Sequence, residues 1–169
     1  MSKHFIYLRG QPATGKITIA RILEKELGWK VFWFHELKNA VYDIVKEHRI
    51  PRLMDDLTRP ILQFLLERVD NLIYVRPSPD KETIESVDSL LKEFPDYDMK
   101  VIRLTATYDT LLERVKNRED EYRISTKEDL DEYVNSRAET PFPGEFSVAT
   151  DGRTPEDIAN EIIKIVNSE

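Results

Sequence analysis

Short apolar runs alternate with longer amphipathic segments along most of the chain. Runs of strand length lie at 4–8, 30–34, 72–75, 99–106 and 146–150. Between them, apolar residues recur every three to four positions, which predicts helices at 16–27, 36–48 and 52–69, from Pro79, at Leu111 to Val115, after Thr126 and from Pro155. Strands that alternate with helices indicate an α/β fold, with a parallel sheet between two helical layers (α/β/α).

Several helix ends carry recognisable signals. Gly28 follows the first helical pattern as a natural stop. Ser78 is expected to cap a helix whose first residue is Pro79, and Thr154 with Pro155 opens the last helix in the same way. These positions divide the chain into elements of ordinary length.

The two least regular segments are 52–69 and 117–142. Pro60 interrupts the first and predicts a kink or a fresh helix start there. The second is mostly charged and has only a short helical pattern after Thr126. Without an internal repeat or a linker, the whole chain, 1–169, is predicted to be one domain.

The composition narrows the class of protein. The chain has 169 residues, 40% of them hydrophobic, which is enough for one stable core. The net charge of -7 disfavours general attraction to nucleic acid or anionic membranes. Cysteine is absent, which excludes disulfides and thiol chemistry and fits a reducing compartment. Without an apolar run of membrane-spanning length, a cytoplasmic protein is expected.

One stretch indicates a chemistry: residues 5–18, FIYLRGQPATGKIT. Gly10, Gly15 and Lys16 have the GxxxxGK spacing of a phosphate-binding loop, after a predicted strand and at the start of a predicted helix. The alternative is a tight turn with a solvated lysine, but a lysine in the first helical turn opposes the helix dipole. We therefore predict a nucleotide phosphate site formed by Gly10, Gln11, Pro12, Ala13, Thr14, Gly15, Lys16, Ile17 and Thr18.

The loop departs from the full pattern at its last position. Ile17 stands where a serine or threonine normally binds magnesium, and the hydroxyl comes one residue later, at Thr18. This change removes one metal ligand but no backbone phosphate donor. Magnesium keeps several waters in most protein sites, so it can still be held through the phosphates.

The sequence GQPATGKIT resembles the loop of adenylate kinase and other nucleoside monophosphate kinases, in which a glycine separates the lysine from a following threonine. The resemblance implies a sheet with strand order 2-3-1-4-5, phosphoryl transfer with ATP and Mg²⁺ as cofactors, and Thr18 near the α-phosphate. The segments FHEL near residue 34 and TPFP near residue 140 are similar to bacterial P-loop proteins called shikimate-kinase-like or AAA-type ATPases.

Two arginines follow the fourth predicted strand. Arg114 and Arg118 lie four residues apart, on one face of a helix. A solvated helix face is the simple explanation. The resemblance to small P-loop kinases implies instead that Arg114 stacks on adenine and that Arg118 reaches the phosphates from a lid at 117–142, with Arg123 as a third contact. Lys16 and these first two arginines form the predicted catalytic set.

The turn at 150–153, TDGR, resembles the base-binding turn of the same kinases, which contacts adenine mainly through backbone atoms. Asp151 and Gly152 are therefore predicted to bind the nucleotide. A plain strand-to-helix turn is the alternative, and the two are compatible.

The acceptor is expected outside the carboxyl ends of strands two and three, where ligands bind in such sheets. Arg76 follows strand three and is predicted to bind an anionic acceptor; His35 or Glu36, after strand two, is predicted to take the acceptor's proton. A capping or solvated role for His35 is equally compatible with the sequence.

The magnesium-holding carboxylate is not identified. Related kinases usually have an aspartate near the end of strand three, where this chain has Arg76. Asp80 is close by but is expected to start a helix, and Asp55 and Asp56 are candidates without a spacing argument.

These observations predict an ATP-dependent phosphotransferase that acts on a small-molecule or nucleotide acceptor, without nucleic acid or membrane partners. A nucleotide-binding module that has lost catalysis is the alternative, because of Ile17 and the missing aspartate. A polynucleotide 5′-hydroxyl kinase is disfavoured by the acidic charge. The oligomeric state is not predicted.

Overall fold

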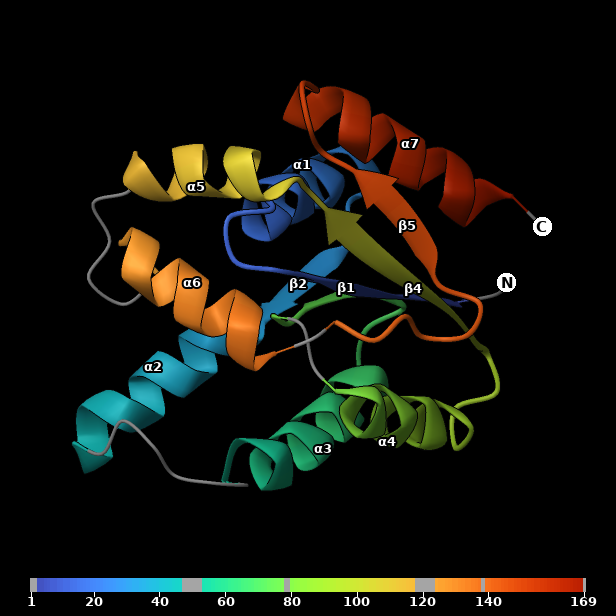
Figure 1. Cartoon of the computed structure of the whole chain (residues 1–169). Coiled ribbons are helices and arrows are strands. Elements are labelled where there is room, and N and C mark those ends of the chain that lie inside the picture. The colour runs from blue at the N-terminus through green and yellow to red at the C-terminus, as the bar shows by residue number, and fades with distance from the viewer. Residues whose placement is uncertain (1–2, 47–52, 78–79, 118–123, 138, 169) are drawn as a thin grey trace.

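A parallel β-sheet forms the centre of the molecule (Figure 1). The computed structural model describes residues 3–46, 53–77, 80–117, 124–137 and 139–168, without the side chains of 53–55. Within them the elements are β1 (Lys3–Gly10), α1 (Lys16–Leu27), β2 (Lys30–Trp33), α2 (Phe34–Val45), α3 (Leu53–Leu66), β3 (Asn71–Val75), α4 (Lys81–Leu91), β4 (Tyr97–Thr105), α5 (Tyr108–Lys116), α6 (Lys127–Ser136), β5 (Phe146–Ala149) and α7 (Pro155–Asn167). The strand order in this part of the chain is β2-β3-β1-β4-β5, which confirms the predicted order.

Helices cover both faces of the sheet (Figure 1). On the central strand β1, Ile6 and Leu8 pack with α1 and α7, whereas Phe5 and Tyr7 pack with α3 and α4. Side chains alternate between the faces of a strand, so each face receives one of these pairs. The predicted three-layer α/β/α architecture is confirmed.

A third, smaller apolar cluster lies at the carboxyl ends of the strands. It joins Ala13, from the loop after β1, to Leu111 and Val115 of α5 and Leu130 of α6. Helix α6, in the segment predicted to form a lid, is thus packed near the phosphate-loop sequence. Its first turn is capped by Thr126, whose hydroxyl accepts a hydrogen bond from the Asp129 N–H at 3.1 Å.

Two helices begin at positions that differ from the predicted ones. Helix α2 starts at Phe34, directly after β2, because no polar cap precedes it that would mark the start in the sequence. Helix α4 starts at Lys81, and its cap is Asp80, which accepts a hydrogen bond from the Thr83 N–H at 2.8 Å. The prediction that Ser78 caps this helix and that Pro79 begins it is therefore wrong. Ser78 and Pro79 themselves lie outside the described part of the chain.

Helix α3 runs through Pro60 without a fresh start, which corrects one of the two outcomes predicted for that residue. A proline inside a helix removes one backbone hydrogen bond. Leu62 and Leu66, both fully buried, follow the proline and hold this part of the helix against the sheet. Tertiary packing keeps the helix continuous where local propensity would end it.

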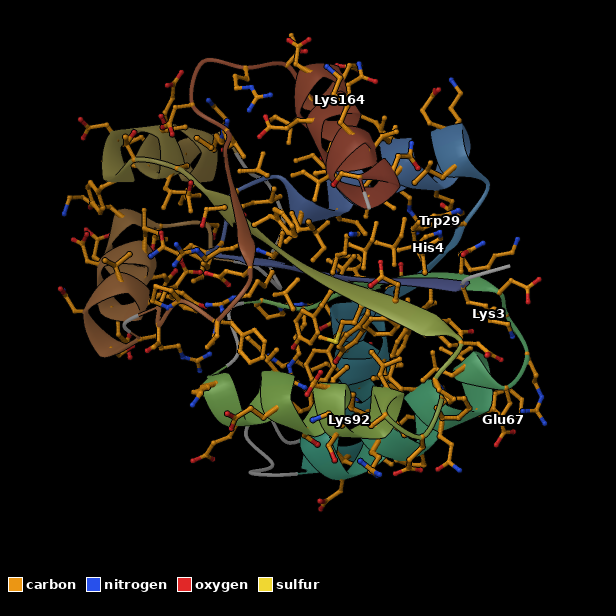
Figure 2. All side chains as sticks on the ribbon, turned by 90° about the vertical axis from the view of Figure 1, so that its right-hand side faces the viewer. Lys3, His4, Trp29, Glu67, Lys92 and Lys164 are labelled. Atoms are coloured by element: carbon orange, nitrogen blue, oxygen red, sulfur yellow. The ribbon has the colours of Figure 1, made fainter. Side chains whose placement is uncertain are left out.

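At the opposite end of the sheet, where β1 starts, Lys3 and His4 lie at the same end of the molecule as Trp29 (Figure 2). The rings of His4 and Trp29 stack with centroids 5.2 Å apart, and Lys3 Nζ lies 3.4 Å from Asp70 Oδ1. Among the described residues, no helix combines the length and apolar character needed to cross a bilayer.

Candidate active site

The loop between β1 and α1 has the geometry that the glycine pattern predicts. Gly10 has φ +148°, and a Cβ there would lie 2.5 Å from the Leu104 carbonyl oxygen on the neighbouring strand β4. Gly15 has φ +88° and immediately precedes the first turn of α1. Both positions need a residue without a side chain, because L-residues rarely adopt these conformations and Gly10 has no room for a Cβ. The chain thus turns tightly from the sheet into the helix, with the helix N-terminus directed into the loop.

Hydrogen bonds within the loop hold its shape. Thr14 is buried and its hydroxyl donates to the Gln11 carbonyl oxygen at 2.8 Å. Ala13 has φ +66°, a left-handed conformation that costs a non-glycine residue about 1 kcal/mol. The Ala13 carbonyl accepts a hydrogen bond from Arg114 Nη1 at 3.2 Å, so α5 holds the strained turn from outside.

Lys16 lies at the centre of the loop. Its ammonium donates to the carbonyl oxygens of Gly10 and Gln11, both at 2.7 Å. The ammonium is therefore held on the concave side of the loop, where it can exchange carbonyl partners for phosphate oxygens. This exchange favours an anionic ligand, because a hydrogen bond between two charged groups is stronger than one to a neutral carbonyl.

A cavity of about 440 Å³ opens on this side of the loop. Four parts of the chain line it: the loop with the start of α1, the segment from β2 into α2, Pro77 after β3, and the segment predicted to form a lid. The lining residues are Pro12, Ala13, Gly15, Lys16, Ile17, Thr18, Trp33, His35, Lys38, Pro77, Ile124, Tyr133 and Arg137. The structure thus brings the predicted residues Lys16, Ile17, Thr18 and His35 to one cavity.

Two cationic side chains that line this cavity, Lys38 and Arg137, were not predicted from the sequence. Lys38 is half-buried, and burial, followed by repulsion from Arg137, lowers the pKa of its ammonium. Both effects disfavour the charged lysine, and an anion bound in the cavity would reverse the second one. Lys38 lies three residues after His35, so the two share a helical face; extending the His35 argument by one turn would have found it. No motif marks Arg137.

The three residues predicted to bind the acceptor do not meet in one cavity. His35 lines the cavity beside the loop. Glu36 is exposed and lies 3.6 Å from Arg21 on α1. Arg76 places its guanidinium 4.3 Å from the centre of the Phe34 ring and lines a separate cavity of about 190 Å³, which Thr58 of α3 and Thr83 of α4 also line.

The physical reason for the different place of Arg76 is the alternation of side chains along β3. Tyr74 packs with α3 and α4, and Val75 packs with α1 and α7. Arg76 follows the strand two residues after Tyr74, and its Nη1 donates to the Tyr74 hydroxyl at 3.4 Å. The arginine is therefore on the α3 and α4 side.

Arg114 joins the loop to the end of β5. Besides the bond to Ala13, its Nη1 donates to the Thr150 hydroxyl and its Nη2 to the Thr150 carbonyl, both at 2.9 Å. The predicted stacking on adenine stays a prediction, but the guanidinium already has a structural role. Arg118 and Arg123 lie outside the described residues.

Asp151 holds the beginning of α5. Its carboxylate accepts hydrogen bonds from the Thr107 N–H at 2.8 Å and from the Thr107 hydroxyl at 2.7 Å. These two bonds, the largest influences, lower the pKa of Asp151 to about 2. The carboxylate of Asp151 is thus engaged with Thr107, which leaves backbone atoms for the predicted recognition of adenine by Asp151 and Gly152.

We expect Asp151→Ala to lower the stability of the protein at pH 7 and to have a smaller effect in acid. A carboxyl group with a pKa of about 2 in the folded state, against about 3.9 when unfolded, stabilises the fold above pH 4 and loses that contribution as the pH falls toward 2. Urea midpoints of both proteins at pH 7, 4 and 2.5 measure this. Glu113→Ala removes a carboxylate from an exposed position of α5, the helix that Asp151 holds at its beginning, and is the control. An undiminished difference at pH 2.5 would contradict this role.

The candidate carboxylates for magnesium do not lie together at one site either. Asp80 caps α4, as predicted for a helix-start residue. Asp56 is exposed on α3, and the side chain of Asp55 lies outside the description. In the part of the chain that the structure describes, no three acidic, histidine or cysteine side chains form a group able to hold a metal ion.

Fold and loop together define a small P-loop protein of the kinase type. Residues 6–139 match the family described as AAA domain, and the chain belongs to this family. Two archaeal relatives are provisionally named adenylate kinases. The Pyrococcus furiosus protein is 29% identical, with 96% of this chain and 84% of the relative covered; the Methanosarcina mazei protein is 25% identical, with 96% and 86% covered.

Solved structures of kinases have the same fold. A sugar kinase from Janibacter sp. aligns with a TM-score of 0.69 at 17% identity, over 99% of this chain and 96% of that one. The APS kinase of Mycobacterium tuberculosis, in complex with AMPPNP and APS, aligns with a TM-score of 0.66 at 15% identity, over 99% of both chains. These neighbours establish the fold, and the relatives support a P-loop kinase.

Proposed function

We propose that the protein transfers the γ-phosphoryl group of ATP to a small anionic acceptor bound in the cavity beside the phosphate loop. The proposal rests mainly on one observation. Lys16, at the centre of the loop, lines the same cavity as Lys38, Arg137 and His35. A cavity with three cationic side chains favours ligands with several negative charges. The triphosphate of ATP supplies some of these charges and an anionic acceptor supplies the others.

The loop residues have defined roles in this proposal. Backbone groups from Gly10 to Thr18 hold the phosphates, and the Lys16 ammonium moves from the Gly10 and Gln11 carbonyls to the β- and γ-phosphate oxygens. Arg118 would add a charge from the lid. Arg114 would keep the loop in shape while its guanidinium plane faces the base.

Magnesium fits this site as an ion that arrives with the nucleotide. Ile17 lines the cavity without offering an oxygen, and the exposed hydroxyl of Thr18 is the nearest alternative along the loop. Mg²⁺ prefers oxygen ligands and keeps several waters. The ion, when bound, would neutralise phosphate charge, held mainly by the phosphates and by water.

The function is tested by ADP formation from MgATP in the presence of AMP, gluconate or shikimate. AMP comes first, because the two relatives are provisionally named adenylate kinases. Coupled ADP detection and mass spectrometry of the products should show one phosphorylated acceptor. Nucleotide binding without turnover or transfer would favour a second function, that of a nucleotide-binding module. Ile17 is the observation that supports it, because it replaces the hydroxyl residue that normally binds magnesium.

We expect Lys38→Ala to raise the KM for the anionic acceptor about tenfold, or about 1.4 kcal/mol, because one charged contact in a half-buried wall is lost. The KM for ATP should change less than threefold. Steady-state kinetics with each substrate varied separately measure both values. Lys25→Ala, at an exposed position of α1, is the matched control. An equal increase in both KM values would contradict the assignment of Lys38 to the acceptor.

A further inference from the structure

The segment 139–145, which we call the strap, lies between α6 and β5 in the sequence and is attached beside the phosphate loop by a buried arginine. Arg9 directly precedes Gly10, the first residue of the loop, and its side chain has no exposed surface. Its Nη1 and Nη2 both donate to the Thr140 carbonyl oxygen, at 3.2 and 3.1 Å, and its Nη1 also donates to Glu145 Oε2 at 3.0 Å. Both ends of the strap are therefore fixed to the strand that leads into the loop.

Two further contacts fix the middle and the end of the strap. The Phe142 side chain packs against the apolar cluster of α3 and α4, and its carbonyl accepts a hydrogen bond from the Glu145 N–H at 3.1 Å. Arg103, on β4 beside Arg9, places its Nε 3.0 Å from Glu145 Oε1. Figure 1 shows this orange segment on the α4 side of the sheet. The strap thus has a defined position relative to β1 and β4.

Helix α6 and its cap residue bring two side chains to the cavity beside the phosphate loop. Tyr133 and Arg137 lie four positions apart, so they share one face of the helix, and both line that cavity. The Arg137 guanidinium lies 5.2 Å from the centre of the Tyr133 ring, and the Arg137 N–H donates to the Tyr133 carbonyl at 3.1 Å. These contacts hold Arg137 to the helix, but they do not hold the helix to the rest of the protein.

The packing of α6 against the rest of the molecule is limited. Within Lys127–Ser136 only Leu130 is fully buried, in the small apolar cluster that includes the phosphate loop and α5, and Val134 is partly buried against the same cluster. A helix with so little buried apolar surface depends on the attachments at its ends for its position. After the cavity residues, the next attachment along the chain is the Thr140 carbonyl, three positions beyond Arg137.

We propose that Arg9 is a positioning residue that holds Tyr133 and Arg137 in the wall of the cavity that Lys16 also lines. A guanidinium presents its N–H groups in a rigid planar fork, and here two of them converge on one carbonyl oxygen, so the distance and direction of the Thr140 carbonyl are both set. Arg9 is also the residue next to the phosphate loop. The same side chain therefore relates the loop to the end of α6.

The contact with Thr140 can be separated from the ion pair with Glu145. Arg103 is a second cation 3.0 Å from Glu145, so the end of the strap before β5 keeps one attachment when Arg9 is replaced. In the described part of the chain, the side-chain hydrogen bonds to the Thr140 carbonyl come from Arg9 alone. Loss of Arg9 should therefore release the end of the strap next to α6 and leave the other end attached.

The test measures the position of α6 directly and needs no acceptor. The chain contains no cysteine, so Lys25→Cys on α1 and Glu132→Cys on α6, both at exposed positions, accept one spin label each. Double electron–electron resonance should give one narrow distance distribution when Arg9 is present. In the Arg9→Leu/Glu145→Gln protein the distribution should become about twofold wider. Glu145→Gln alone keeps the bonds to Thr140 and should leave the distribution unchanged.

Two more variants separate positioning from a general loss of stability. Leu66→Ala removes a buried side chain at the opposite end of the sheet, where the Tyr97 hydroxyl donates to the Leu66 carbonyl, and should lower stability without widening the distribution. Arg9→Lys keeps a cation beside Glu145 but has one nitrogen in place of the fork, so it should widen the distribution less than the double variant does. Arg9→Lys decides the question if the double variant does not fold.

The consequence for catalysis rests on the proposed function, because it concerns the anionic acceptor. With AMP, gluconate or shikimate, whichever the wild type phosphorylates, the double variant should have a KM for the acceptor about tenfold higher, the effect of losing one hydrogen bond from the Arg137 guanidinium. The Kd for ATP, measured by calorimetry, should change less than about threefold, because Lys16 and the loop backbone are retained.

The outcomes separate this inference from the proposed function. An unchanged distance distribution in the folded double variant overturns the positioning role, whatever the activity of the protein. Equal widening in Glu145→Gln alone also overturns it, because the ion pair and not the Thr140 contact would then place α6. Loss of ATP binding in the double variant would mean that Arg9 shapes the loop itself, which contradicts the proposal. A wild type that never turns over ATP overturns the proposed function, and the distance measurement still decides the role of Arg9.

Discussion

Lys16→Ala is expected to abolish stabilisation of the protein by ATP and ADP and to lower any turnover about 10²- to 10³-fold, the usual effect of removing one group that stabilises developing charge. The ammonium lies 2.7 Å from two loop carbonyls, so it is already positioned where the phosphates bind. A ligand at 100 times its Kd stabilises the folded state by about 2.7 kcal/mol. In a chain of this size this corresponds to a rise in Tm of about 5–10 °C.

The measurement is a thermal-shift series with ATP and ADP, each with and without magnesium. The wild type should show the shift and the Lys16→Ala protein should not, although its own Tm without ligand should be close to that of the wild type. Lys25→Ala removes a lysine from an exposed position of the same helix and should keep the full shift. A full shift in Lys16→Ala would mean that the loop is not the nucleotide site.

Arg9→Leu is expected to destabilise the protein by about 3 kcal/mol, at the lower end of the range for breaking a buried ion pair. The arginine has no exposed surface and its partner Glu145 has 4%, so neither group can turn to water when the other is removed. The effect stays at the lower end because Arg103 still neutralises Glu145. Urea unfolding measures the difference in free energy.

Two further variants show whether the pair is the cause. Arg59→Leu breaks an exposed ion pair with Glu93, which should cost about 1 kcal/mol or less. The double variant Arg9→Leu/Glu145→Gln removes both partners of the buried pair. It should be more stable than the sum of the effects of Arg9→Leu and Glu145→Gln, measured separately, predicts. Additive effects would indicate that Arg9 and Glu145 stabilise the protein independently.

Local patterns were enough to predict most of the fold. The strands were predicted because each is an apolar run, and helix α1 was predicted to its last residue because Gly28 ends it with φ +70°. The starts of α2 and α4 were predicted less well. Trp33 offers no polar cap for α2. Before α4 the sequence offers two polar capping residues, Ser78 and Asp80, and only the tertiary structure selects Asp80.

The candidate site was predictable only where a motif has fixed internal geometry. Gly10, Gly15 and Lys16 determine the loop because their spacing sets its backbone. Lys38 and Arg137 approach the loop from separate segments, so no spacing relates them to it. Once Tyr74 is known to face α3, the alternation of side chains along the strand places Arg76 on the same side. The position of Arg76 in the sequence, directly after β3, does not by itself indicate which side of the sheet it occupies.

The pairing of Arg9 with Glu145 is also expected to influence when the phosphate loop forms during synthesis. Arg9 and Glu145 are separated by 136 positions in the sequence. A nascent chain that has emerged only as far as β4 contains the whole GxxxxGK loop but not the carboxylate that allows Arg9 to be buried. Burying an unpaired arginine is strongly unfavourable. The loop should therefore reach its final shape late, after β5 has joined the sheet. Truncated chains that end before Glu145 should not bind nucleotide.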